Sequence, residues 1–236
     1  DGGSEGLSGL YLVRHGQASA FTHDYDRLSP LGEEQCERLR EYWAVNEQPF
    51  DEVWSGTLKR QRDSARILVG EGNFIEDAAW NEYDGDGLIE KLGPVLAERH
   101  EQVRELFVAW EEHKDGPRRA QHFQRVFEKV TDAWVAGEVA HPGVESWVEF
   151  RERVLGALRA IQEGRPGRNV LVVTSGGPVG VVTSHVLEAA RQKAIEMNWR
   201  VRNCSLTTFV FGGGRISLDG FNATPHLTDP RLLTFR

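Results

Sequence analysis

Cysteine is scarce in this sequence, and its scarcity excludes two classes of protein. Only Cys36 and Cys204 occur among the 236 residues, and they lie far apart in the chain. Two cysteines are too few for a disulfide framework, and no Cys-x-x-Cys spacing indicates a zinc site. We expect two buried, reduced thiols, which fits a reducing cytoplasm.

Long hydrophobic runs are also absent. No stretch reaches the roughly 18 consecutive apolar residues that a transmembrane helix needs. Residues 1–9 are rich in glycine and polar side chains, without the charged start and apolar run of a signal peptide. We interpret them as a flexible tail, and we expect a cytoplasmic protein with no membrane partner.

Positive charge is in deficit. The chain has 28 Lys and Arg against 36 Asp and Glu, which gives a formal net charge of −8. Because nucleic-acid-binding surfaces usually carry a basic surplus, we expect no nucleic-acid partner. A local cationic pocket remains compatible with this charge, since the net value says little about a single cleft.

Short apolar runs and amphipathic segments alternate along most of the chain. This alternation predicts an α/β fold, a three-layer α/β/α sandwich with a mostly parallel central sheet. A glycine run at 212–214 between two apolar segments indicates a β-hairpin. Strands are predicted at residues 9–14, 51–54, 74–75, 169–174, 206–211 and 215–218, and helices from a Ser29 cap and over 58–69, 145–162 and 176–192.

Residues 94–136 interrupt the alternation. Val103 and Trp110 belong to one amphipathic pattern and Phe123 and Trp134 to a second, each at helical spacing. A turn signal, Lys-Asp-Gly-Pro, lies between them. We interpret this segment as a helical hairpin inserted into a single domain of residues 10–236.

The tripeptide Arg14-His15-Gly16 follows directly after the first predicted strand. Ligand sites in open α/β sheets gather at the carboxyl ends of strands. A histidine there can present a ring nitrogen to phosphorus, and an adjacent arginine can neutralise phosphate oxygens. A glycine lets the backbone approach a ligand closely. The tripeptide therefore favours phosphoryl chemistry.

Four segments together resemble a known family, the histidine phosphatase superfamily, also called phosphoglycerate mutase-like. Residues 12–17, Leu-Val-Arg-His-Gly-Gln, resemble its signature. Residues 55–65 are similar to the family's second element, Ser-x-x-Leu-x-Arg-Ala-x-Gln-Thr-Ala. Residues 81–85, Asn-Glu-Tyr-Asp-Gly, resemble its acid/base element, and residues 142–146 resemble the Gly-Glu-Ser start of a late helix.

The resemblance implies a role for each matching residue. His15 is the phosphate-accepting nucleophile, with Arg14 and Arg60 as phosphate-binding arginines. Glu82 is the general acid and base. Metal ions and other cofactors are not expected, because arginines supply the electrostatic stabilisation.

Several nearby residues offer alternatives. Arg62 is interpreted as a surface charge or as a residue that supports the phosphate ligands from behind, while Asp84 and Asp86 compete with Glu82 for the acid/base role. Gln17 and His23 are candidates for lining the pocket. A metal held by residues 23, 24 and 26 fits by ligand type alone, and its spacing matches no metal signature.

One element departs from the family's pattern. The late strand of the family ends in Ser-His-Gly-Gly, whereas residues 174–177 here are Thr-Ser-Gly-Gly. Ser175 therefore stands where the family has a second pocket histidine. Ser175 and Gly176 are still expected to bind phosphate, because the helix that follows can offer backbone N–H groups.

These observations predict a metal-independent phosphomonoester hydrolase that forms a phosphohistidine on His15. Its expected partner is a phosphorylated small molecule, with a phosphoprotein as an alternative substrate. A phosphoglycerate-mutase-type phosphotransferase also fits the motifs. A weakly active or non-catalytic phospholigand-binding protein fits them too, because Ser175 replaces the histidine. The sequence leaves the oligomeric state open.

Overall fold

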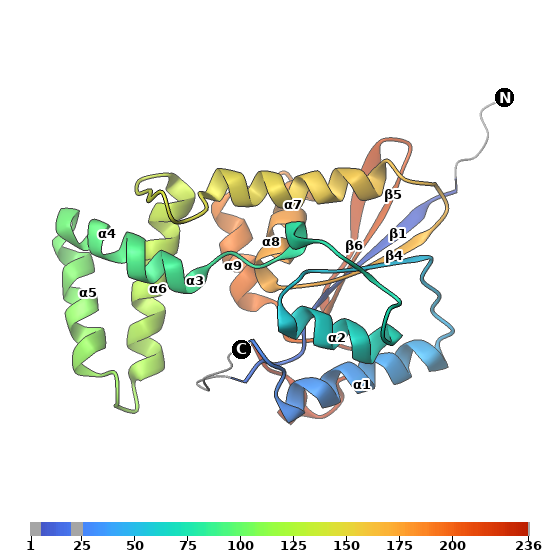
Figure 1. Ribbon diagram of the computed structural model, residues 1–236, viewed down its shortest axis with the longest axis horizontal. Coiled ribbons are helices and arrows are strands. Elements are labelled where there is room, and N and C mark those ends of the chain that lie inside the picture. The colour runs from blue at the N-terminus through green and yellow to red at the C-terminus, as the bar shows by residue number, and fades with distance from the viewer. Residues whose placement is uncertain (1–5, 20–25, 236) are drawn as a thin grey trace. The chain divides into compact units, whose positions relative to one another are not determined.

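A computed structural model describes residues 6–19 and 26–235 of the chain (Figure 1). Its contacts divide the chain into two compact units, and each is described by itself. The first comprises Asp1–Glu82 and Arg153–Arg236, and the second comprises Tyr83–Glu152. The second unit is wider at both ends than the insertion of residues 94–136 that the sequence indicates.

The first unit is built on a six-stranded sheet with strand order β3-β2-β4-β1-β5-β6. β1 and β2 both pair in parallel with β4, and β3 pairs in parallel with β2. β5 is antiparallel to β1, and β6 to β5. The predicted mostly parallel sheet is confirmed. The strands are β1 (Ser8–Arg14), β2 (Glu52–Ser55), β3 (Ile75–Glu76), β4 (Asn169–Thr174), β5 (Leu206–Gly212) and β6 (Arg215–Ala223).

Helices cover both faces of this sheet and complete the three layers. In Figure 1, α1 and α2 lie on one face, and α8 with the C-terminal part of α7 lies on the other. The helices are α1 (Pro30–Val45), α2 (Lys59–Val69), α7 (Trp147–Gln162), α8 (Gly176–Val186) and α9 (Gln192–Arg200), with short 3-10 turns η1 (Ala78–Trp80) and η3 (Pro230–Leu232).

Because helices cover both faces of the sheet, the central strands have apolar residues on both sides and appear in the sequence as continuous apolar runs. Val13, Leu171 and Val173 pack with residues of α1 and α2 in one hydrophobic cluster. That cluster includes Cys36 and Cys204, which are buried and free, as predicted. Their Sγ atoms lie 3.9 Å apart.

The local signals at helix α1 are confirmed in detail. Ser29 is the N-cap, and its hydroxyl accepts a hydrogen bond from the backbone N–H of Gly32. Pro30 occupies the first turn, where its missing N–H costs nothing. These residues fix where the chain leaves the loop after β1 and begins to cover the sheet.

The second unit is helical and contains the predicted hairpin. α5 and α6 pack together, and the rings of Trp110 and Phe123 meet edge to face with centroids 5.4 Å apart. Tyr83, Trp134 and Phe150 form an aromatic cluster in the same unit. The elements are α3 (Gly85–Gly87), a π-helical turn η2 (Leu88–Leu92), α4 (Gly93–Arg99), α5 (Glu101–Glu112) and α6 (Arg119–Ala136).

Three predicted boundaries are wrong. β1 begins at Ser8, one residue before the predicted strand, so Ser8 belongs to the sheet rather than to a tail. β6 continues to Ala223 instead of ending at residue 218. The helix expected over 176–192 ends at Val186, and a separate helix, α9, follows. α9 packs so closely on α8 that a Cβ at Gly180 would lie 2.1 Å from the carbonyl oxygen of Ala194.

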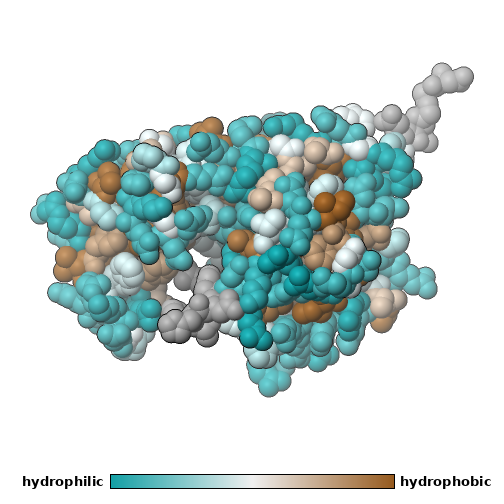
Figure 2. All heavy atoms as spheres, viewed as in Figure 1, coloured by the Kyte–Doolittle hydropathy of each residue, from teal (hydrophilic) through white to brown (hydrophobic). Residues whose placement is uncertain are grey.

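The visible face in Figure 2 is covered mainly by hydrophilic residues, with scattered apolar side chains. Within the part of the chain that the structure describes, no helix is both long and apolar enough to cross a membrane.

Two helical glycines should respond oppositely to alanine. A Cβ at Gly32 would lie 2.2 Å from the backbone oxygen of Gln17, whereas one at Gly156 in α7 would meet only a guanidinium nitrogen at 3.8 Å. Gly32→Ala should therefore destabilise the protein by about 2 kcal/mol through overpacking. Gly156→Ala should stabilise it by about 1 kcal/mol through helix propensity. Thermal denaturation of both variants measures the difference, and equal shifts would contradict this packing.

Candidate active site

The candidate site lies where the chain leaves the middle of the sheet. β1 is flanked by β4 and β5, and His15 follows its last residue. The backbone N–H of His15 donates to the carbonyl oxygen of Thr174 at the end of β4, with an N···O distance of 2.8 Å. The two strand ends that carry His15 and Ser175 are thus joined, as expected for neighbouring parallel strands.

The His15 ring is held in one tautomer by its two hydrogen bonds. Nδ1 lies 2.7 Å from the carbonyl oxygen of Gly16. Because a carbonyl oxygen can only accept, we assign the proton to Nδ1. Nε2 then carries the lone pair, and it accepts a hydrogen bond from Nε of Arg60 at 3.2 Å.

The surroundings of His15 keep the ring neutral. Burial is the largest cause that lowers the pKa of His15 well below its ordinary value of 6.5, and the charges of Arg60 and Arg14 lower it further. A neutral imidazole with its lone pair on Nε2 is the form that can act as a nucleophile.

The backbone after His15 is held by side chains from two helices. The N–H of Gly16 donates to the hydroxyl of Ser64, and the N–H of Gln17 donates to Oε1 of Gln35. Sequence reasoning missed Ser64 and Gln35, although both occupy inward positions of predicted helices. Gly16 has a packing reason not anticipated from the sequence, since a Cβ there would lie 2.4 Å from the carbonyl oxygen of Gly32.

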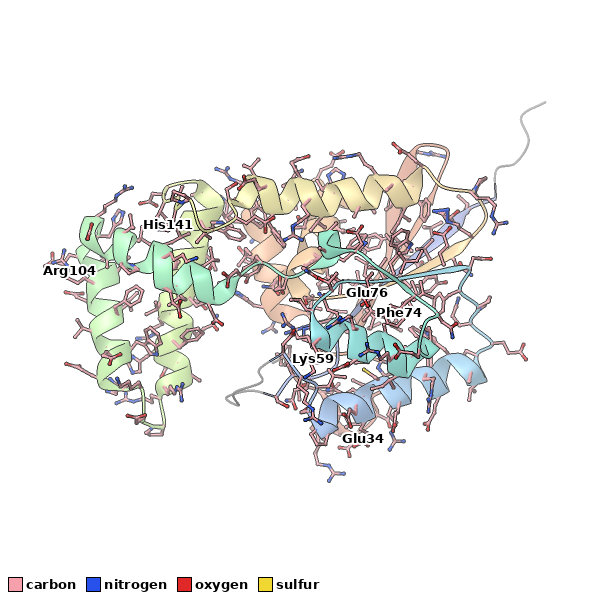
Figure 3. The ribbon with its side chains drawn as sticks, viewed as in Figure 1. Glu34, Lys59, Phe74, Glu76, Arg104 and His141 are labelled. Carbon is pink, nitrogen blue, oxygen red and sulfur yellow. The ribbon has the colours of Figure 1, made fainter. Side chains whose placement is uncertain are left out.

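Arg60 is paired with an acidic residue that the sequence did not single out for this role. Nη1 of Arg60 lies 2.6 Å from Oδ1 of Asp26. Oδ2 of Asp26 also accepts from the backbone N–H of Lys59, at the start of α2 (Figure 3). The Asp26 carboxylate therefore binds both the positive N-terminal end of α2 and one terminal nitrogen of the Arg60 guanidinium.

The structure describes only some of the other loop residues that the sequence suggested. His23 and Asp24 lie outside the described residues, so the predicted pocket role of His23 stays a prediction. Among the residues that the structure does describe, no group of His, Cys, Asp and Glu is arranged to hold a metal ion. The side chain of Gln17 accepts a hydrogen bond from the hydroxyl of Ser29.

The two remaining arginines differ in their surroundings. Arg14 is half-buried and donates to the backbone oxygen of Val201. Arg62 instead forms an ion pair with Glu76, with an N···O distance of 3.7 Å. Arg60, rather than Arg62, therefore contacts His15, which agrees with the preference for Arg60 from the sequence.

Glu82 reaches the start of α8. Its Oε2 accepts a hydrogen bond from the backbone N–H of Gly177 at 3.0 Å, which places a carboxylate at the positive end of that helix. The competing carboxylate of Asp84 is used locally in the second unit, where it caps α3 by accepting from Gly87. Asp86 lies within that short helix.

Ser175 is fully buried, and its hydroxyl accepts a hydrogen bond from the side-chain amide of Gln61 at 2.9 Å. Sequence reasoning did not identify Gln61, although it is adjacent to Arg60. Gly176 begins α8, and a Cβ there would lie 2.1 Å from Oδ1 of Asn198. The glycine is therefore required by the packing of α9.

A family model confirms what these features indicate. The model of the histidine phosphatase superfamily (branch 1) matches residues 10–136 and 121–224. The chain belongs to the histidine phosphatase superfamily. A comparison with curated protein sequences finds no match.

Solved structures of two phosphatases and a mutase share the fold. A phosphoglycerate mutase of Bacillus anthracis is 18% identical, with a TM-score of 0.64 over 94% of this chain and 96% of the other. A phosphoserine phosphatase variant of Entamoeba histolytica in complex with phosphoserine is 18% identical, with a TM-score of 0.62 over 93% and 99%. An alpha-ribazole phosphatase of Shigella flexneri is 16% identical, with a TM-score of 0.61 over 92% and 96%.

Asp26 should weaken anion binding because its charge offsets that of Arg60. Asp26→Asn keeps the oxygen that accepts from α2 but removes the negative charge. We expect inorganic phosphate to bind more tightly by about 1 kcal/mol, or roughly fivefold. Glu76→Gln is the matched control, since Glu76, labelled in Figure 3, forms its ion pair with Arg62. Isothermal titration with phosphate measures both, and equal affinities in the two variants would contradict the assignment.

Proposed function

We propose that this chain is a phosphomonoester hydrolase that forms a phosphohistidine on Nε2 of His15. The observation that supports the proposal most directly is the neutral ring, with Nδ1–H donated to Gly16 and Nε2 facing Arg60. A lone pair beside a fixed guanidinium suits attack on a phosphoryl group, because the transferred oxygens need positive charge around them.

In the first step, the lone pair of Nε2 attacks phosphorus and the bond to the leaving oxygen breaks. Protonated Glu82 gives its proton to that oxygen, so the product alcohol departs neutral. The phosphoryl group stays on Nε2. The ring gains positive charge, which the hydrogen bond from Nδ1 to the Gly16 carbonyl stabilises.

In the second step, water attacks the phosphohistidine. The Glu82 carboxylate takes a proton from the water, phosphate leaves, and the lone pair returns to Nε2. Glu82 is then protonated again, so the cycle closes. Arg14 and Arg60 hold the phosphoryl oxygens throughout, which removes the need for a metal ion. The N–H groups at the start of α8 add to this positive field.

We propose a phosphorylated small molecule as the substrate and a cytoplasmic location. The similar proteins are named for phosphoserine, phosphoglycerate and alpha-ribazole chemistry, which supports this substrate class. The same likeness supports a mutase as the second candidate. A mutase would return the phosphoryl group from His15 to its substrate, whereas a hydrolase passes it to water.

The buried state of Ser175 favours a third candidate, a phospholigand-binding protein with little turnover. The hydroxyl of Ser175 is hydrogen-bonded to Gln61, so it is engaged within the protein. Tight phosphate binding without hydrolysis of any phosphomonoester would identify this function.

His15→Ala should abolish phosphoenzyme formation. Rapid quenching with a labelled phosphomonoester should trap one acid-labile, base-stable phosphoryl group in the unmodified protein and none in the variant, because His15 supplies the attacking lone pair. His141→Ala is the control, as His141 is an exposed histidine of the second unit (Figure 3). Equal labelling of unmodified protein and His15→Ala would remove His15 as the nucleophile.

Glu82→Gln should discriminate between leaving groups. Alkyl phosphates need a proton on the departing oxygen, so their kcat should fall on the order of a hundredfold. Aryl oxides leave without being protonated, so kcat for aryl phosphates should fall less than about tenfold. Asp84→Asn should leave the ratio of the two rates unchanged. Identical losses for both substrate classes in Glu82→Gln would assign the acid elsewhere.

A further inference from the structure

We propose that Gln61 and Ser175 form a matched pair that replaces the second pocket histidine, with Gln61 acting as a positioning residue for Glu82. This inference rests on the proposed function for its catalytic part. Its structural part concerns two side chains that contact each other inside the first unit, whatever reaction the site performs.

Gln61 is completely buried, and its side-chain amide is fully engaged. Nε2 donates to the hydroxyl of Ser175 at 2.9 Å and to the carbonyl oxygen of Trp80 at 3.1 Å. Oε1 accepts from the backbone N–H of Leu58 at 3.2 Å. Both amide hydrogens are therefore used within the protein, and neither remains for a phosphate.

The backbone next to Gln61 leaves room for its side chain. A Cβ at Gly56 would lie only 1.9 Å from Oε1 of Gln61, so a side chain at residue 56 would displace the glutamine amide from its present position. Gly56 is buried at the end of β2. The amide therefore sits in a recess that the absent side chain of Gly56 leaves open, and three hydrogen bonds hold it there.

The two residues depart from the family's pattern in opposite directions. The second element of the family has alanine where this chain has Gln61, and the late strand has histidine where it has Ser175. One position has gained a long side chain and the other has lost an imidazole. Because the two side chains are in contact, the glutamine amide fills the space released by the smaller serine.

The pair also connects the two parts of the chain that position Glu82, namely the segment before it and the start of α8. Trp80, two residues before Glu82, has a carbonyl oxygen that accepts from Gln61 and from the hydroxyl of Thr174 at 2.6 Å. Ser175 immediately precedes the α8 amides, one of which binds the Glu82 carboxylate. Gln61 thus connects the segment that carries Glu82 to the helix that receives its carboxylate.

Chemically, this pair differs from a histidine in one decisive way. An amide and a hydroxyl carry no charge across the working pH range, so this corner of the pocket does not titrate. We assign Ser175 an indirect role in place of the phosphate contact that the sequence suggested. The charge on phosphate is then balanced by the arginines and the start of α8.

The structural part is tested with Ser175→His, Gln61→Ala and the double variant. Histidine adds four heavy atoms to a fully buried position against Gln61, so Ser175→His alone should lower the thermal midpoint by roughly 5 °C. The double variant should recover most of that loss, because alanine frees the recess. It should also gain phosphate affinity at acidic pH, with an ionisation below the ordinary histidine value of about 6.5, because burial disfavours the charged ring.

The catalytic part is tested with Gln61→Ala alone. If Gln61 positions Glu82, kcat for alkyl phosphates should fall about tenfold and kcat for aryl phosphates about twofold. Arg62→Ala is the control, because its side chain pairs with Glu76 outside the pocket. A purely structural role would lower both rates by the same factor.

Two results would overturn the proposal. The first is additivity, in which the thermal midpoint of the double variant falls by the sum of the two single losses. The second is a Gln61→Ala variant with equal losses for both substrate classes. The thermal and phosphate-binding measurements need no turnover. A chain that hydrolyses no phosphomonoester would therefore refute the proposed function and still leave the pair testable.

Discussion

The hydrogen bond from Nδ1 of His15 to the carbonyl oxygen of its neighbour Gly16 is the interaction on which the site depends. It assigns the single ring proton to Nδ1 and so leaves the lone pair on Nε2, beside Arg60. Burial and two arginine charges disfavour a second proton and keep the ring neutral. Each feature alone is common in proteins, but together they produce an imidazole prepared to accept a phosphoryl group.

The rest of the first unit serves to hold this short loop in place. The sheet joins His15 to the end of β4, while Ser64 and Gln35 bind the next two backbone N–H groups. Gln35 also donates to the hydroxyl of Thr234, which ties the C-terminal segment to the same loop. A network in which each buried polar group has a partner fixes geometry better than apolar packing alone, because hydrogen bonds are directional.

Much of this architecture could be predicted from the sequence, since it follows from local signals. The Ser29 cap, the apolar run of β4 and the Arg-His-Gly tripeptide are each readable within a few residues. Asp26 and Gln61 were not predicted, because their partners lie on other elements of the fold. The break between α8 and α9 was missed for the same reason, as the close approach of Gly180 to Ala194 has no local signature. The sequence supplies the chemistry of each side chain, and only the fold decides which side chains meet.

The central claim, a neutral His15 with its proton on Nδ1, can be tested without any substrate. Nitrogen-15 NMR of histidine-labelled protein distinguishes a protonated from an unprotonated ring nitrogen, and His15→Ala identifies the signal. The account predicts a His15 ring with Nδ1 protonated and Nε2 unprotonated at neutral pH. It also predicts that this ring stays neutral as the pH falls through 6.5, because its pKa is lowered. A ring protonated on Nε2, or one that titrates at or above 6.5, would contradict it.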